Sequence, residues 1–296
     1  MTSLLTISIL GCATEDLSFN NHPFEPETST IDPLIEDLLW PTDLTTTPNG
    51  IQVLEQDAST IHQLSDSTIE TSWEWSETPL QILNVDDVTW VLTESGIFPL
   101  EDSSESIEDN SITKMFAFND TLHWLHVNDT SEIQTLEGSV MEIDALLDET
   151  IVVQDSLYAL DRQSKELLLL DTVQGTASVA FQFSDEPRKL FASDDVLYVT
   201  TRSSRWPYGG WIIRLDGSED SWSETRLCDS PPEAEHILVH DGSIYWSSKQ
   251  SITRISIEGG TYDMIAPMST VGDMSVFDSN LWWTDYKGGR IYRLPL

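Results

Sequence analysis

One kind of unit recurs seven times along this chain of 296 residues, and this repetition limits the possible folds more than any other feature. Each unit contains an aromatic-rich strand, a polar turn and a second strand. The last two copies read IYWSSKQSITRISIEGG (244–260) and LWWTDYKGGRIYRLPL (281–296). A period near 40 residues with about four short strands per unit predicts an all-β propeller.

A pair of turn-forming residues precedes the aromatic strand of every unit, and successive pairs lie 33 to 47 residues apart. Such pairs reverse a chain between two antiparallel strands. They mark seven four-stranded blades, each with an inner strand before the turn and an aromatic strand after it. The pairs are Asn49-Gly50, Asp86-Asp87, Asn119-Asp120, Asp155-Ser156, Asp194-Asp195, Asp241-Gly242 and Asp278-Ser279.

The seventh unit supplies three strands and then the chain ends, which would leave an apolar sheet edge uncovered. Natural sheets avoid such edges. We therefore expect the N-terminal side of the chain to donate the missing outer strand. The apolar segment LIEDLLW (34–40) lies directly before the first inner strand and is the candidate.

The units that begin at Ile244 and Leu281, with WWTD at 282–285, resemble the YWTD repeats of receptor propellers and their bacterial relatives. The resemblance covers these two units well and the other five loosely. It implies the propeller fold, and because that family builds six blades, six blades are the alternative to seven. Binding modules, lyases and lactonases all use such propellers, so the resemblance implies no single function.

The first twelve residues, MTSLLTISILGC, contain an apolar run that is too short to span a bilayer. ILGC (9–12) resembles the lipobox of bacterial lipoproteins, in which the cysteine is acylated and becomes the mature N-terminus. We predict a signal segment over residues 1–12, lipidation at Cys12, a disordered acidic tether over 13–33 and a single propeller domain over 34–296. A plain secretory signal, or an N-terminus whose cysteine falls there by chance, is the alternative.

The formal net charge of −37 disfavours nucleic acid as a partner, because the phosphate backbone would be repelled. The chain has only two cysteines, which excludes a disulfide framework within one chain, and its histidines show no zinc-ligand spacing. We predict no metal and no cofactor, and contact with the membrane only through the lipid anchor. A monomer in the cell envelope is expected, at the outer membrane or the periplasmic face, with secretion as the alternative.

Loops that would share one face of the ring hold most of the few cations, and one of these loops is enlarged. Ligand binding at this face is a fair expectation, because insertions in surface loops often carry function and aromatic rings stack on sugars, peptides or cations. The ligand would be a small anion or a carbohydrate, or an envelope protein would bind instead. The candidate residues are Arg202, Arg205, Trp206, Tyr208, Trp211, Arg188 and Lys189.

Two plainer interpretations of the same residues stay open. The enlarged loop could be a hairpin whose rings pack on a neighbouring blade. The cations could simply pair with acids in the same loops, such as Glu186, and exposed pairs of that kind contribute little.

The sequence supports three hypotheses of function. The first is an exported, lipid-anchored binding or scaffold module. The second is a hydrolase or lyase at the mouth of the central channel, with His236 as a weak acid–base candidate beside Arg188, Lys189 and Asp273. The third is an inert surface lipoprotein. An enzyme would gather polar groups with perturbed pKa values in one deep pocket, whereas a binder can use a broad aromatic rim.

Overall fold

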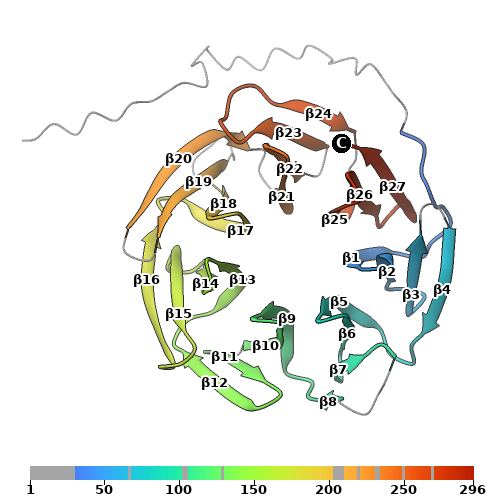
Figure 1. Ribbon diagram of the computed structural model, residues 1–296, viewed down its shortest axis with the longest axis horizontal. Coiled ribbons are helices and arrows are strands. Elements are labelled where there is room, and N and C mark those ends of the chain that lie inside the picture. The colour runs from blue at the N-terminus through green and yellow to red at the C-terminus, as the bar shows by residue number, and fades with distance from the viewer. Residues whose placement is uncertain are drawn as a thin grey trace, which may run out of the picture.

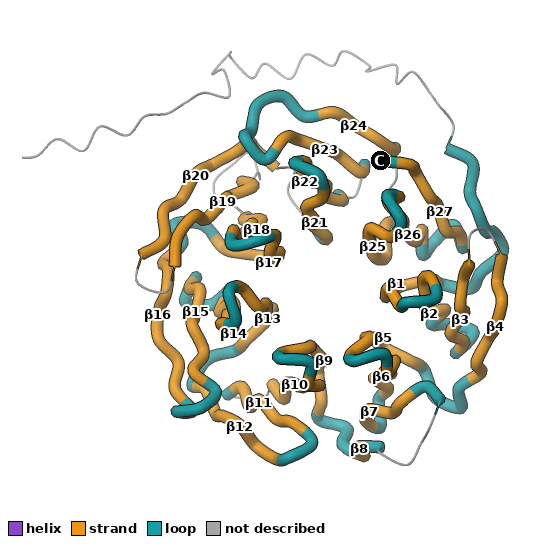
Figure 2. Tube along the Cα trace, viewed as in Figure 1, coloured by secondary structure: helices purple, strands orange, loops and turns teal. Residues whose placement is uncertain are grey.

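The computed structural model describes residues 31–65, 68–101, 106–127, 130–202, 210–218, 221–230, 234–248, 251–267 and 270–296. These residues form seven small antiparallel sheets arranged in a closed ring (Figures 1 and 2). The predicted seven-bladed propeller is therefore confirmed, and the six-bladed alternative is excluded. Within the described ranges no helix has the length and apolar character needed to cross a bilayer.

The strands of each blade run in chain order from the ring axis outward (Figure 1). The inner strands are β1 (Pro41–Thr47), β5 (Pro79–Val85), β9 (Ile112–Phe118), β13 (Leu147–Val153), β17 (Glu186–Ser193), β21 (His236–His240) and β25 (Val271–Phe277). The second strands are β2 (Gly50–Glu55), β6 (Val88–Thr93), β10 (Thr121–Val127), β14 (Ser156–Asp161), β18 (Val196–Arg202), β22 (Ser243–Ser247) and β26 (Asn280–Asp285).

The third strands are β3 (Thr60–Ser65), β7 (Gly96–Pro99), β11 (Ser131–Thr135), β15 (Glu166–Asp171), β19 (Gly210–Ser218), β23 (Ile252–Ser256) and β27 (Arg290–Pro295). The outer strands are β4 (Thr68–Glu74), β8 (Ile107–Glu108), β12 (Gly138–Ile143), β16 (Thr176–Gln182), β20 (Ser221–Ser230) and β24 (Asp263–Ala266).

Burial follows from the packing of blade against blade. All six residues of β2 are buried, whereas those of β4 are almost all exposed. A second strand is covered on both faces by neighbouring blades, so its apolar residues do not alternate with polar ones. The core is divided into seven apolar clusters, each between two consecutive blades.

The hairpins between inner and second strands explain the recurring Asp and Asn residues. Asp86 and Asp87 both have positive φ, and so do Asp278 and Ser279. Two consecutive positive φ values are typical of the type I′ turn, whose twist matches that of a β-hairpin. Asp and Asn tolerate this conformation better than most residues do.

The seventh sheet has three strands, and the N-terminal segment completes it as predicted. Ile35 forms an antiparallel bridge with Ile291 of β27, and the N–H of Leu34 donates to the carbonyl of Ile291 at 2.8 Å. The N–H of Leu38 donates to the carbonyl of Gly289 at 3.0 Å, and the Leu38 side chain is buried between the first and last blades. This contact is an isolated bridge with flanking hydrogen bonds rather than a full strand.

Candidate functional site

Five inner strands share an irregularity close to their first residue. The pairing of β1, β5, β9, β13 and β17 with the strand beside each shifts register there. A bulge of this kind turns the following side chain in a new direction. The residues after the shift are Asp43, Gln81, Lys114, Glu149 and Lys189.

The last two blades place comparable residues at the same end. Asp273 lies within the register shift of β25, and His236 is the first residue of β21, where no shift occurs. We call the set Asp43, Gln81, Lys114, Glu149, Lys189, His236 and Asp273 the axial belt. Every blade contributes one member.

We call a contact between the belt regions of two neighbouring blades a step of the belt. Three steps are hydrogen bonds between a side chain of one blade and the backbone of the next. Oδ2 of Asp43 accepts a hydrogen bond from the N–H of Ile82 at 2.7 Å, and Oδ2 of Asp273 accepts one from Leu44 at 3.2 Å. Gln81 accepts from the N–H of Met115 at 2.8 Å and donates to the carbonyl of the same residue at 3.1 Å. In each case the backbone partner directly follows a belt residue.

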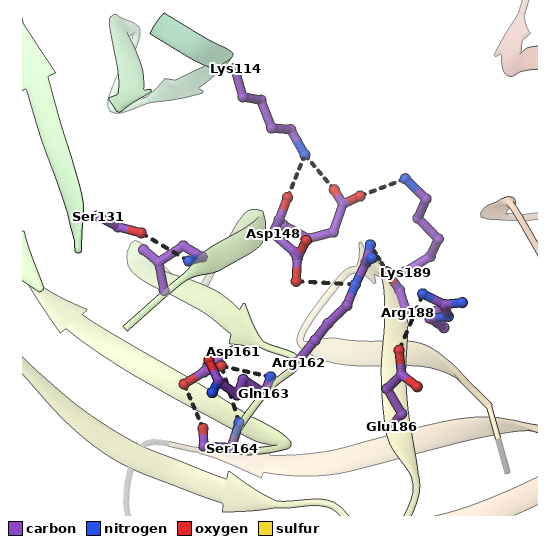
Figure 3. Close-up of polar contacts among 12 residues, drawn as sticks. Lys114, Ser131, Asp148, Asp161, Arg162, Gln163, Ser164, Glu186, Arg188 and Lys189 are labelled. Atoms are coloured by element: carbon purple, nitrogen blue, oxygen red, sulfur yellow. Dashed lines mark hydrogen bonds and ion pairs between the residues drawn. The ribbon is translucent and has the colours of Figure 1, made fainter. Parts of the chain in front are cut away.

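Two further steps are ionic. Nζ of Lys189 lies 2.6 Å from Oε1 of Glu149, and the ammonium group of Lys114 contacts Oε2 of the same carboxylate. Figure 3 shows the side chains of Lys114 and Lys189 pointing toward each other from different strands. Burial alone would raise the pKa of Glu149, but the two ammonium groups outweigh it and hold the pKa below its usual value.

A sixth step joins His236 to Asp273, with Nδ1 of the ring 3.2 Å from Oδ1 of the carboxyl group. Burial raises the pKa of Asp43 well above its usual value, and repulsion by Asp273 raises it further.

The belt lines a pocket of about 270 Å³ on the ring axis. Six of the seven inner strands contribute to its wall, because only β5 is missing from it. The lining residues are Asp43, Lys114, Glu149, Lys189, Leu190, Glu235, His236, Ile237, Gly272, Asp273 and Met274. We call this space the axial pocket.

Of the residues predicted for an active site at the channel mouth, three line this pocket. These are His236, Lys189 and Asp273. Arg188 does not line it, because its guanidinium group pairs with Glu186 at 3.2 Å.

The residues of the enlarged loop are only partly covered by the described ranges. Arg202 is the last residue of β18 and is half-buried. Trp211 lies in β19, packs against the core between blades 4 and 5, and has the guanidinium carbon of Arg226 4.8 Å from its ring centroid. Arg205, Trp206 and Tyr208 lie outside the described residues, and so does Cys12.

Asp43, Gln81 and Glu149 were not predicted as members of a site with Lys189, and Lys114 was predicted only as one of the cations on the same face of the ring. A signal for them exists in the sequence, because most inner strands begin with an apolar residue, any residue and then a polar one. Examples are PTD at 41–43, PLQ at 79–81 and PRK at 187–189. The same register in successive repeats places such residues at the same height around the axis.

The first blade also contains a histidine relay. Nε2 of His62 lies 2.6 Å from Oε2 of Glu55, and Nδ1 lies 2.8 Å from Oγ of Ser72. The order serine, histidine, acid is that of a hydrolytic triad. Glu55 also accepts a hydrogen bond from the N–H of Leu39, so this relay ties the N-terminal segment to three strands of blade 1.

No protein-family model matches the sequence, and no curated protein is similar to it. The resemblance to YWTD repeats therefore remains a prediction from the sequence. Solved structures are similar in fold. One is BamB from Moraxella catarrhalis, with 14% identity over 86% of this chain and 83% of that chain and a TM-score of 0.58.

Two other similar structures come from different settings. The extracellular domain of the one-component system BT4673 from B. thetaiotaomicron has a TM-score of 0.68 and 10% identity over 90% of this chain and 41% of that chain. The WD40 domain of Neurospora crassa Pan2 has a TM-score of 0.62 and 14% identity over 92% of this chain and 91% of that chain. Likenesses at this level of identity establish the β-propeller fold and nothing narrower.

Proposed function

We propose that this chain is an exported, lipid-anchored β-propeller of a bacterial cell envelope that binds a small polar ligand in the axial pocket. The main support for a binding role is the way in which that pocket is built. Six blades build its wall, and hydrogen bonds and ion pairs between blades hold the wall in place. A preformed pocket loses little conformational freedom when a ligand binds.

The chemistry of the wall favours binding of a ligand over docking of a large partner at this point. Most of the lining residues are polar or charged, and the volume of about 270 Å³ suits a small molecule. Pockets for drug-sized ligands have volumes of about 300–1,000 Å³ and more apolar walls. An envelope protein that binds elsewhere on the ring remains compatible with this role.

Calorimetric titration of the purified full chain tests the binding role. The titrants are small amino acids, carboxylates, amines and monosaccharides. We expect saturable binding by members of one class, lost in the variant Asp273→Ala and retained in Glu258→Gln, whose side chain is 78% exposed on blade 6. If none of the four classes binds, the proposed pocket function is wrong.

The envelope location rests on the apolar segment and the ILGC sequence at residues 9–12. One structural neighbour is an extracellular domain, which accords with export. The test is the intact mass of protein purified from membranes of the native host. Cleavage before Cys12 with an acyl-sized excess of mass supports the anchor, and Cys12→Ser should abolish that excess.

Cys228 provides the matched control, because it is a cysteine buried within the folded propeller and Cys228→Ser should leave acylation unchanged. Recovery of an unmodified chain with an intact Met1 from the soluble fraction would contradict both the anchor and the envelope location.

A second candidate function, hydrolysis or lyase chemistry in the same pocket, is favoured by Asp43. Its raised pKa lets it keep a proton at a pH where most carboxyl groups have lost theirs, and a general acid needs this property. Chromogenic esters and glycosides test the idea. Turnover that disappears in Asp43→Asn while folding is retained would support catalysis, whereas absence of turnover in the parent protein contradicts it.

A further inference from the structure

The axial belt is interrupted at one place among the described residues. Six of its seven steps are made by a hydrogen bond or an ion pair between neighbouring blades. Between Lys189 of β17 and His236 of β21, no such contact is found in the described part of the chain. Both residues line the axial pocket, so the interruption lies in its wall.

The two sides of this interruption differ in charge. On the side of β17, Lys189 and Lys114 share the single carboxylate of Glu149, which leaves one positive charge in excess. The ammonium group of Lys189 has three N–H donors, and Glu149 uses one of them. This side can therefore donate hydrogen bonds to a negatively charged group.

The opposite side presents acceptors. Glu235, directly before β21, lines the pocket, and no hydrogen bond or ion pair to its carboxylate is found among the described residues. His236, Asp273 and Asp43 line the same part of the pocket, so carboxyl groups outnumber cations on this side. This side therefore suits a positively charged donor.

We propose that the axial pocket binds a small zwitterion of the α-amino acid type, which connects blade 5 to blade 6. The carboxylate of the ligand accepts from Lys189, and its ammonium group donates to Glu235. This inference rests on the proposed ligand-binding function and names the class of ligand.

The other small-ligand classes fit the wall less well. A simple carboxylate satisfies Lys189 but shares the pocket with the acidic residues Glu235, Asp43 and Asp273. A simple amine satisfies Glu235 but faces two lysine ammonium groups in the same pocket. Charges inside a pocket interact more strongly than charges in water, so this mismatch discriminates. A neutral sugar leaves both charged sides without a countercharge.

Binding of such a ligand closes the belt, so it also stabilises the ring. A ligand that binds the native state alone raises the unfolding temperature in proportion to the logarithm of its concentration. For a domain of this size, a ligand present at 100 times its dissociation constant should raise the unfolding temperature by roughly 5 °C.

The experiment compares L-alanine with propionate, which lacks the amino group of alanine, and with ethylamine, which lacks its carboxylate. Thermal unfolding and calorimetric titration of the full chain are recorded with each of them, followed by the other common amino acids. We expect at least one amino acid to bind and to raise the unfolding temperature, whereas propionate and ethylamine do neither.

Two variants assign the contacts. Glu235→Gln removes the proposed partner of the ligand ammonium group without breaking a contact described in the fold, and it should weaken binding at least about tenfold. Lys189→Gln should weaken binding similarly, but it also removes an ion pair with Glu149. Glu235→Gln therefore remains informative even if Lys189→Gln folds poorly. Glu258→Gln is the control that should bind like the parent protein.

The possible failures are distinct. If propionate, ethylamine or a sugar binds as tightly as any amino acid, the zwitterion assignment is wrong while the proposed ligand-binding function stands. Amino-acid binding that Glu235→Gln leaves unchanged overturns the assignment of the contact. If no compound binds, the proposed function itself fails.

Discussion

The backbone N–H of Leu44 donates a hydrogen bond to Oδ2 of Asp273 at 3.2 Å, which joins residues 229 positions apart in the chain. Leu44 belongs to the first blade and Asp273 to the last, so this bond closes the ring on its axial side. Asp43, the neighbour of Leu44, lines the same pocket as Asp273. Both ends of the propeller domain therefore meet at the axial pocket.

The seam between the first and last blades should tolerate no added side chain at Gly272. A Cβ atom there would lie 2.8 Å from the carbonyl oxygen of Pro41 and 3.0 Å from Cα of Thr42. These are backbone atoms, so relief requires the two blades to separate. We expect Gly272→Ala to lower the free energy of unfolding by about 1–3 kcal/mol, measured by urea denaturation.

The control for this variant is Val173→Ala, because the Val173 side chain is 95% exposed. It should change the free energy of unfolding by less than about 0.5 kcal/mol. If Gly272→Ala is as stable as the parent protein, the first and last blades pack less closely at residue 272 than these distances indicate.

The segment that completes the seventh blade offers two adjacent leucines with opposite environments. Leu38 is 9% exposed and packs between the first and last blades, whereas Leu39 is 58% exposed. Leu38→Ala should lower the free energy of unfolding by about 2–3 kcal/mol, and Leu39→Ala by less than about 0.5 kcal/mol. Equal effects in chemical denaturation would argue against closure of the ring by residues 34–38.

Glu149 should contribute to stability at neutral pH and not in acid. Its folded-state pKa is lowered, so its contribution is complete above the unfolded-state pKa of about 4.5 and disappears as the pH falls through the folded-state value. We expect Glu149→Gln to cost about 1–3 kcal/mol at pH 7. The difference from the parent protein should shrink progressively below pH 4.5, as measured by denaturation across pH; a constant difference would contradict the prediction.

Asp43 should have the opposite dependence. Its folded-state pKa is raised, so its favourable contribution is complete below the unfolded-state pKa and is lost as the pH rises through the folded-state value. Asp43→Asn cannot ionise, yet its side-chain oxygen can still accept from Ile82. The variant should therefore gain stability relative to the parent protein as the pH increases from 5 to 9.

The companion variant Asp43→Ala separates charge from hydrogen bonding. It leaves the N–H of Ile82 without its acceptor at every pH, so it should be less stable than Asp43→Asn throughout this range. A stability difference between Asp43→Asn and the parent protein that does not vary with pH would show that Asp43 does not titrate there.

The repeat made the blade number, the strand order and the closing segment predictable. Asp278 and Ser279, for example, mark a hairpin in the sequence and adopt its positive φ values in the structure. The axial belt was not predictable in the same way. A register shift at the entrance to β13 redirects Glu149, and an alternating apolar pattern does not reveal where such a shift occurs.

Pairings between side chains of neighbouring blades could not be predicted from the sequence either. His236 and Asp273 could each be placed near the channel mouth from the repeat, but their contact depends on how two neighbouring blades are rotated relative to each other. Similarly, the scarcity of cations did not show that two lysines from different blades meet at the single carboxylate of Glu149.

The bridge between Ile35 and Ile291 can form only after residue 291 has been synthesised, so the ring cannot close before then. A chain made at about 5–20 residues per second needs roughly 15 to 60 s to reach residue 291. Until then, the apolar surface that the first blade buries against the last blade is exposed, even if the intervening blades have folded. A nascent or prematurely terminated chain therefore exposes this apolar surface. Chaperones or proteases that recognise apolar surfaces can act on it.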